Sequence, residues 1–210
     1  MTLPGITGQI PRGGRTISGV TDPRDWRSRK RDETHERIYS AALRLFTERG
    51  YDAVSVAQIA AAAGVSVPTF YAHFPAKELV VIHVPSPETI ARMLARQPGD
   101  RAMAERMRGV ARDWFAAFDH GGRAEMLARW RIVATHPGLR FRSAEVERAT
   151  AKLVLDHLRE DGGEVSASDA VVVNAYLSAV NTVLLSWADS EGRRSLEELT
   201  DEAFEALSSH

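Results

Sequence analysis

Two short helical segments joined by a glycine turn, within residues 50–74, constrain this chain more than any other part of its sequence. Ser55 and Gln58 have the spacing of a capping box, in which each residue's side chain accepts from the other's backbone N–H. Gly64 permits the positive φ that a tight turn requires. Ser66 is placed to be the N-cap of the next helix. The spacing therefore predicts a helix, a tight turn and a second helix in close succession.

A longer amphipathic helix is predicted before this pair. Its pattern begins at about Glu33, and Gly50 supplies a C-cap glycine. The apolar stripe of this helix comprises Ile38, Ala41, Ala42, Leu45 and Phe46. Phe70 and Phe74, four residues apart, are predicted to pack against it as core. Three such helices form the smallest unit that places a helix end in the major groove of DNA.

The string from Gly50 to Leu79, GYDAVSVAQIAAAAGVSVPTFYAHFPAKEL, resembles the N-terminal signature of the TetR family of transcriptional regulators. The similarity extends over Ile38 to Ile82. It implies an all-α fold, with an N-terminal three-helix helix-turn-helix DNA-binding domain and a C-terminal helical ligand-binding and dimerisation domain. It also implies a repressor that a small, largely apolar effector releases from a palindromic operator.

The candidate DNA contacts are of three kinds. Hydroxyls and a small apolar side chain in the first turn of the third helix suit base edges or a thymine methyl. The family's tyrosine and lysine at the matching positions touch phosphates, and His73 either does the same or caps its neighbours. Groups at the positive end of the second helix suit a phosphate or a flanking base. The candidates are Ser55, Gln58, Ser66, Val67, Thr69, Tyr71, His73 and Lys77, with Arg29, Lys30 and Arg31 from the preceding segment.

Glycine and proline divide the chain into three predicted regions. Residues 1–31 are expected to form a flexible arm whose basic end either reaches DNA or is a solvated leader. Residues 32–80 are the expected DNA-binding domain, and residues 81–210 the ligand-binding domain. A linking helix is predicted from Ala76 to about Val84, with a new helix restarting at Ser86 and Pro87. We hypothesise that this proline break, at Pro85 and Pro87, acts as a hinge.

The C-terminal region is predicted to contain several amphipathic helices with methionine- and tryptophan-rich faces. Such side chains either line a deformable cavity or fill a core. The candidate ligand contacts are Met103, Met107, Trp114, Phe118, Met126, Trp130, Asn174 and Tyr176. Residues 167–187 are apolar nearly all round, and a capping box from Ser195 to Glu198 opens a final helix. The resemblance implies a homodimer through residues 166–208, where Asn174 and Asn181 either bond across the interface or anchor a ligand.

Composition excludes several alternatives. The chain has 210 residues and no cysteine, which rules out disulfides and thiolate chemistry, and we expect a soluble, cytoplasmic protein without a membrane span, cofactor or metal. The net charge is +3 over residues 1–80 and -4 over residues 81–210, the polarity of an N-terminal DNA-binding region. No nucleophile elbow or histidine pair at metal-ligand spacing favours an enzyme. A helical small-molecule-binding protein without DNA binding remains the alternative.

Overall fold

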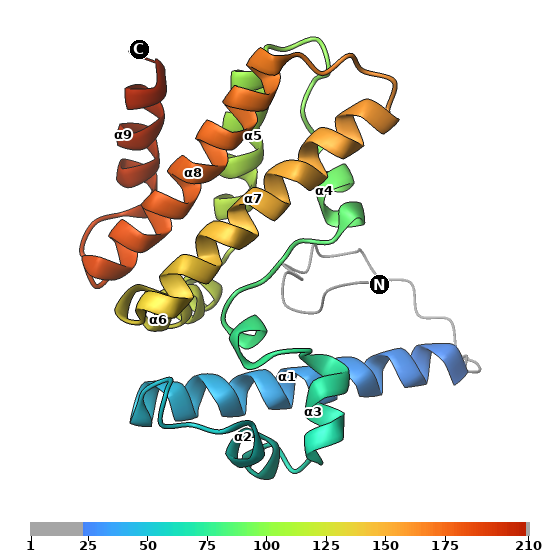
Figure 1. Cartoon of the computed structure of the whole chain (residues 1–210), viewed down its shortest axis with the longest axis vertical. Coiled ribbons are helices and arrows are strands. Elements are labelled where there is room, and N and C mark those ends of the chain that lie inside the picture. Colours follow the sequence, from blue (N-terminus) through green and yellow to red (C-terminus); the bar gives the residue numbers. More distant parts are fainter. Residues whose placement is uncertain (1–22, 209–210) are drawn as a thin grey trace. The chain divides into compact units, whose positions relative to one another are not determined.

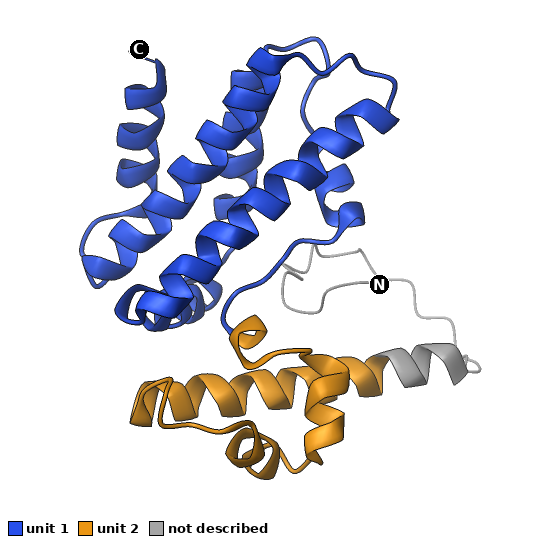
Figure 2. Ribbon diagram, viewed as in Figure 1, with its two compact units in different colours: residues 1–2, 81–210 blue, residues 3–80 orange. Residues whose placement is uncertain are grey.

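The structure is a computed structural model that describes the backbone of residues 23–208 and the side chains of residues 29–208. Within this range the chain forms nine α-helices and one short 3-10 helix, with no β-strand (Figure 1). It divides into two compact units between Val80 and Val81 (Figure 2). We call these the N-terminal unit and the C-terminal unit. The prediction of an all-α fold is confirmed.

The N-terminal unit consists of α1 (Pro23–Arg49), α2 (Val56–Ala62), α3 (Val67–His73) and the 3-10 helix η1 (Lys77–Val80). Both short helices lie on the same side of α1 (Figure 1). The predicted stripe of α1 is buried, as are Phe70 and Phe74, which confirms both assignments. The core of this unit comprises Ile38, Tyr39, Ala41, Ala42, Leu45, Phe46, Val54, Ile59, Ala60, Ala63, Phe70 and Phe74.

Helix α1 begins ten residues earlier than its apolar pattern indicates. Since it starts at Pro23, the prediction of an arm extending to residue 31 was wrong for residues 23–31. Proline fits this position because the first helical N–H groups have no intrahelical acceptor. Residues 29–33 are all exposed, so these five residues have no buried face for periodicity to reveal. Residues 1–22 of the predicted arm lie outside the described residues.

The predicted linking helix over residues 76–84 was also wrong. Only the single 3-10 turn of η1 forms, and residues 81–86 are not helical. The β-branched residues at 80–82 disfavour a helix, and Pro85 restricts the residue before it to extended backbone. The prediction that a new helix begins at Ser86 and Pro87 is confirmed. Ser86 caps α4 (Pro87–Leu94), because its side chain accepts from the Thr89 N–H at 3.2 Å.

The C-terminal unit is a bundle in which α8 is the central helix. It contains α4, α5 (Met103–Ala116), α6 (His120–Thr135), α7 (Pro137–Glu160), α8 (Ala167–Asp189) and α9 (Leu196–Ser208). Helix α8 packs against α5, α6, α7 and α9, with α7 and α9 on either side of it in Figure 1. The predicted capping box of α9 is confirmed, because the Glu198 N–H donates to Ser195 Oγ at 3.0 Å and Glu198 accepts from the Ser195 N–H.

Among the described helices, α8 alone has the length and apolar composition of a membrane-crossing segment. The sequence predicts no membrane span, because polar residues such as Asn174, Ser178 and Asn181 interrupt the apolar run of this helix. In the structure part of the helix packs within the bundle, where Val173, Val183 and other side chains are buried, whereas Val171 is 68% exposed. The same composition thus serves a core helix with several packed sides.

Candidate nucleic-acid interface

The turn between α2 and α3 is built as its sequence predicts. The Gln58 N–H donates to Ser55 Oγ at 3.2 Å, and the Ser55 N–H donates to Gln58 Oε1 at 2.8 Å, so the capping box is complete. Gly64 follows α2 with a φ of +65°, in the left-handed region where a side chain is strained. These local contacts set where α2 begins and where the chain reverses toward α3.

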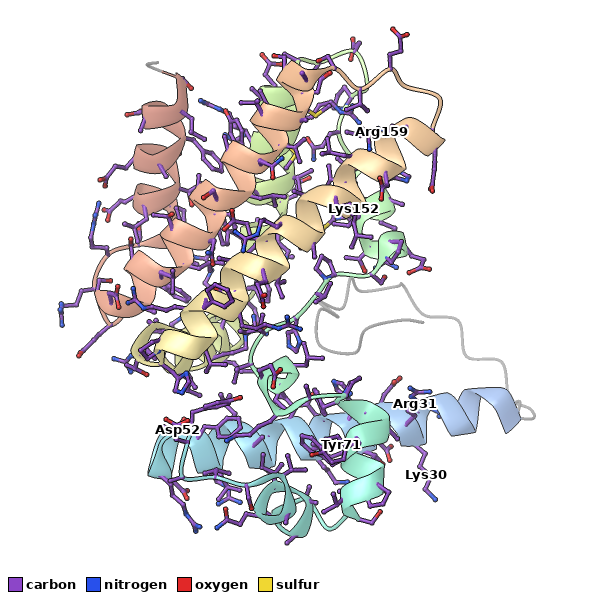
Figure 3. All side chains as sticks on the ribbon, viewed as in Figure 1. Lys30, Arg31, Asp52, Tyr71, Lys152 and Arg159 are labelled. Atoms are coloured by element: carbon purple, nitrogen blue, oxygen red, sulfur yellow. The ribbon has the colours of Figure 1, made fainter. Side chains whose placement is uncertain are left out.

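Helix α3 presents one face to the core and the other to solvent. Phe70 and Phe74 are buried at 0% and 2% exposure, whereas Val67 is 37% exposed and Tyr71 49% exposed. The Tyr71 ring meets the Phe70 ring edge-on, with centroids 5.5 Å apart, and its side chain projects from α3 (Figure 3). The exposed face of α3 therefore offers an apolar side chain at its N-terminal end and a phenol one turn later.

The polar candidates at the helix starts are occupied by capping. Ser66 Oγ accepts from the Thr69 N–H at 3.2 Å and lies 2.8 Å from Thr69 Oγ1. Ser55 and Gln58 bond to one another in the same manner. If any of these groups contacts a base, it must therefore do so with a lone pair or a hydrogen that is not already used in capping. Their first role in this structure is to orient the two helices.

Lys77 joins η1 to the loop after α1. Its Nζ donates to the backbone oxygen of Tyr51 at 2.6 Å and stands 4.0 Å from the centroid of the Tyr51 ring. Burial lowers the pKa of Lys77, although Asp52 and Glu78 oppose this shift. The predicted phosphate contact therefore depends on the ammonium hydrogens that Tyr51 does not use, and it stays a prediction.

His73 lies at the end of α3 against a histidine of α1. The rings of His35 and His73 are 5.8 Å apart, and His35 stacks on Phe74 with centroids 4.2 Å apart. Burial, and then repulsion from His73, lowers the pKa of His35 from 6.5 to about 4. Burial and Arg31 also lower the pKa of His73, whose Nδ1 is buried without a hydrogen-bond partner in the described structure. Burial therefore disfavours the charged form of both rings.

The three basic candidates before the first buried turn are on α1. Arg29, Lys30 and Arg31 are all exposed. Lys30 and Arg31 point to opposite sides of α1 (Figure 3). Arg31 is near enough to His73, at the end of α3, to lower the pKa of that histidine. The helix therefore separates side chains that the sequence places together.

Three further residues belong to the candidate surface and were missing from our sequence analysis. Arg37 is exposed on α1, and its Nη1 lies 4.0 Å from the position that a Cβ on Gly64 would take, so the guanidinium reaches the α2–α3 turn. Pro68 and Ala72 are exposed beside Val67 and Tyr71. Pro68 and Ala72 could have been found from the predicted burial of Phe70 and Phe74, because they lie on the opposite face of the helix.

The candidate ligand contacts separate into two buried clusters of the C-terminal unit. The first, which we call the Tyr176 cluster, joins α4, α5, α7, α8 and α9 and includes Met107 and Tyr176, with Met103 at its edge. The second, the Trp187 cluster, comprises Phe115, Met126, Val183, Leu184, Trp187, Leu196 and Leu199. Trp114, Phe118 and Trp130 are partly exposed and pack against the second cluster. The predicted set is therefore two groups of side chains rather than one.

Two polar members of the predicted ligand set, Tyr176 and Asn174, have hydrogen-bond partners inside the protein. Tyr176 OH accepts from Arg108 Nε at 2.8 Å, and Arg108 also donates to the Phe204 backbone oxygen at 2.8 Å. Asn174 is exposed and donates to the Ala170 oxygen of its own helix. It is therefore separated from the buried candidates. No signal in the sequence pointed to Arg108, because its partners lie far along the chain.

The two predicted asparagines on α8 have different surroundings. Asn181 is partly buried and donates to Glu147 of α7 at 3.1 Å, whereas Asn174 bonds only within α8. Within residues 29–208, no three histidine, aspartate or glutamate side chains gather as a metal site.

Known proteins resemble this chain in both sequence and fold. The family described as "Bacterial regulatory proteins, tetR family" matches residues 38–84. The HTH-type transcriptional activator FasR of Mycolicibacterium smegmatis is 29% identical over 156 residues, which cover 72% of this chain and 70% of FasR. The HTH-type transcriptional regulator TcmR of Streptomyces glaucescens is 31% identical over 139 residues, covering 61% of this chain and 62% of TcmR. A solved transcriptional regulator from Aquifex aeolicus has the same fold, with a TM-score of 0.50 and 19% identity over 83% of this chain and 98% of its own.

Proposed function

The chain belongs to the TetR family of bacterial transcriptional regulators, and on that premise we propose that it is a cytoplasmic repressor that a small effector releases from a palindromic operator. The exposed face of α3 is the observation that carries this proposal. Val67 and Tyr71 are exposed on the helix whose Phe70 and Phe74 are buried. A helix held in this way can enter the major groove with its N-terminal turn against the bases.

In this proposal, α3 reads the bases and the surrounding groups hold the phosphates. Val67 contacts a base edge or thymine methyl, while Tyr71, Lys30 and Arg37 bind the backbone. Ser55, Gln58, Ser66 and Thr69 keep the helix ends in position and use their remaining hydrogen-bonding capacity on DNA. Phosphate contacts supply affinity that falls with salt, and base contacts supply the choice of site.

Dimerisation through α8 and α9 completes the proposed operator complex. Val171 on α8 is 68% exposed and Leu207 on α9 is 38% exposed, which leaves apolar surface on the two helices that the family uses. Two copies related by a two-fold axis would hold their α3 helices about 34–36 Å apart, one turn of DNA. We expect the preferred site to be a palindrome for this reason.

Selection of binding sites from random duplex DNA tests the function. The full chain is expected to enrich a palindrome, with an affinity that falls steeply as salt rises. Val67→Glu places a carboxylate on the exposed face of α3 and should abolish enrichment. Ala149→Glu adds the same charge to an exposed site on α7 and should not. Absence of enrichment by the wild-type chain would leave a ligand-binding protein without DNA binding as the better description. Equal enrichment by both variants would show that the exposed face of α3 does not read the DNA.

Whether the chain represses or activates transcription, and how it responds to the effector, are tested on the selected operator. A reporter placed behind the operator should be expressed less when the chain is present, whereas increased expression would reassign it as an activator, as FasR is named. The non-helical segment 81–86 is the proposed hinge. Replacing Pro85 and Pro87 with alanine should change the effector dose that releases DNA, and an unchanged dose would remove the hinge from the mechanism.

A further inference from the structure

Helix α9 has an unfavourable charge distribution at its C-terminal end. Its residues Leu196–Ser208 include five acidic side chains and no lysine or arginine. The C-terminal end of a helix carries partial negative charge, which basic side chains stabilise and acidic side chains destabilise. Glu205 lies in the last turn of α9, where the helix has no basic side chain of its own. Positive charge from another helix would therefore stabilise this turn.

Arg108 of α5 supplies that charge. Its Nη2 donates to the backbone oxygen of Phe204 at 2.8 Å and to Ser208 Oγ. The Ser208 hydroxyl in turn donates to the same Phe204 oxygen at 2.9 Å. A basic side chain that bonds the last carbonyls of a helix stabilises its end as a C-cap does. Here the basic side chain comes from a residue 96 positions before the carbonyl that it bonds.

Helix α8 holds the same guanidinium in place. Arg108 Nε donates to Tyr176 OH at 2.8 Å. The guanidinium carbon lies 5.9 Å from the ring centroid of Tyr176 and 6.0 Å from that of Phe204, both within range of a cation–π interaction. These two rings are buried, with centroids 4.9 Å apart. Because the planar guanidinium donates in two directions, one side chain of α5 bonds both α8 and α9.

The turn that Arg108 caps carries part of the proposed dimer surface. Leu207 lies between the two capped residues and is 38% exposed. An apolar side chain keeps a fixed place on a helix surface only while its turn is helical, and uncapped helix ends fray. The cap on Phe204 and Ser208 therefore determines whether Leu207 is presented in a fixed position to a second copy of the chain.

We propose that Arg108 is a positioning residue for the dimer: from α5 it caps the last turn of α9 and so keeps Leu207 in the surface that the second copy binds. This inference rests on the proposed function, since dimerisation through α8 and α9 is part of it. Arg108 directly follows Met107, a candidate effector contact in the Tyr176 cluster. Helix α5 thereby carries both a candidate effector contact and the cap of the dimer surface.

Arg108→Met tests the cap, because it removes the guanidinium and keeps a long, unbranched side chain. Sedimentation of the full chain without DNA should show the dimer dissociation constant rising about tenfold, as expected for the loss of a hydrogen bond from a charged group. Hydrogen exchange should become about tenfold faster at the amides of residues 205–208 and stay unchanged in the middle of α8. Arg112→Met removes the same charge from an exposed site one turn further along α5 and should change neither quantity.

Tyr176→Phe separates the contribution of α8 from that of α9. It removes the bond from Arg108 to α8 but leaves both bonds to α9, so the dissociation constant should rise less than in Arg108→Met. Four results would overturn the proposal. These are an unchanged dissociation constant in Arg108→Met, an equal rise in Arg112→Met, an equal rise in Tyr176→Phe, or faster exchange throughout the bundle, which would indicate a general loss of packing.

The sedimentation and exchange measurements contain no DNA, so their outcome is separate from that of site selection. If the wild-type chain dimerises and enriches a palindrome, but Arg108→Met leaves the dimer unchanged, only the role of Arg108 is wrong. If Arg108→Met weakens the dimer but the wild-type chain enriches no DNA, the regulator function is wrong and the cap stands. A monomeric wild-type chain would remove both the proposed dimer and the residue that positions it.

Discussion

The two units of this chain differ in the sequence separation of the contacts that organise them. In the N-terminal unit, Ser55 bonds Gln58 and Ser66 bonds Thr69, each pair three residues apart. In the C-terminal unit, Arg108 bonds residues 68 and 96 positions away, on α8 and α9. The first kind of contact follows from spacing along one segment, and the second requires the whole bundle to be assembled. Spacing along the sequence could therefore predict the caps and the turn around α2 and α3, whereas it could not predict the hydrogen bonds of Arg108.

Removal of an aromatic ring from one core should give the largest difference in stability between the two units. Phe70→Ala removes a fully buried ring from α3 and should cost about 3–5 kcal/mol, enough to unfold a small unit. We expect circular dichroism to show loss of the N-terminal unit's helices while those of the C-terminal unit remain, together with loss of DNA binding.

The matched variant is Phe115→Ala, which removes a ring of similar burial from the Trp187 cluster. It should destabilise the C-terminal unit and leave the thermal unfolding of the N-terminal unit unchanged. A single transition that shifts equally in both variants would show that the units unfold together, and the comparison between them would fail.

Two substitutions separate charge from neutral contacts on the proposed DNA surface. Arg37→Ala should weaken operator binding about tenfold and reduce the slope of log affinity against log salt by about one. Tyr71→Phe removes a neutral hydroxyl, so it should weaken binding about two- to tenfold and leave the slope unchanged. Fluorescence anisotropy over a range of salt concentrations measures both quantities. A slope that does not change in Arg37→Ala would remove that residue from the phosphate contacts.

Acid should destabilise the N-terminal unit selectively through His35. The folded chain holds the pKa of this histidine near 4, against 6.5 when unfolded, because burial and His73 disfavour its charged form. The unfolded chain therefore binds the proton first, so stability is complete above pH 6.5 and is lost as pH falls toward 4. At pH 5 the loss should be about 1 kcal/mol after allowance for the solvent access of the ring.

Thermal unfolding of His35→Phe tests this assignment. Phenylalanine can stack on Phe74 as the histidine does, but its ring cannot be protonated. The unfolding temperature of the N-terminal unit should therefore depend less on pH between 7 and 5 in this variant than in the wild type. An equal pH dependence in the two proteins would assign the acid effect to other groups.

Removal of a helix cap should give the smallest loss of stability among these variants, and the loss should be similar in the two units. Ser55→Ala and Ser195→Ala each remove an N-cap oxygen, from α2 and α9 respectively, and each should cost about 1 kcal/mol. Differential scanning calorimetry should place the first loss in the N-terminal unit and the second in the C-terminal unit. A loss several times larger in one unit would mean that its cap also supports distant packing.

The errors in the sequence analysis have a common physical origin. Residues 23–31 are helical, and residues 29–31 are exposed, so their apolar periodicity could not reveal the helix. Residues 81–84 interrupt a predicted helix because β-branched residues and Pro85 disfavour it. Hydrophobic periodicity reports burial, and it fails where a helix is exposed or where an apolar segment is extended.

By itself, the sequence determined the all-α fold, the helix caps and turn around α2 and α3, and the burial of Phe70 and Phe74. These depend on interactions within a few residues, for which spacing is sufficient. Only the tertiary structure decided that the apolar members of the predicted ligand set divide between two clusters, that Arg108 holds Tyr176, and that Trp130 Nε1 has no hydrogen-bond partner among the described residues. Those outcomes depend on which helices meet, and helices with similar apolar faces can meet in many ways until the bundle is complete.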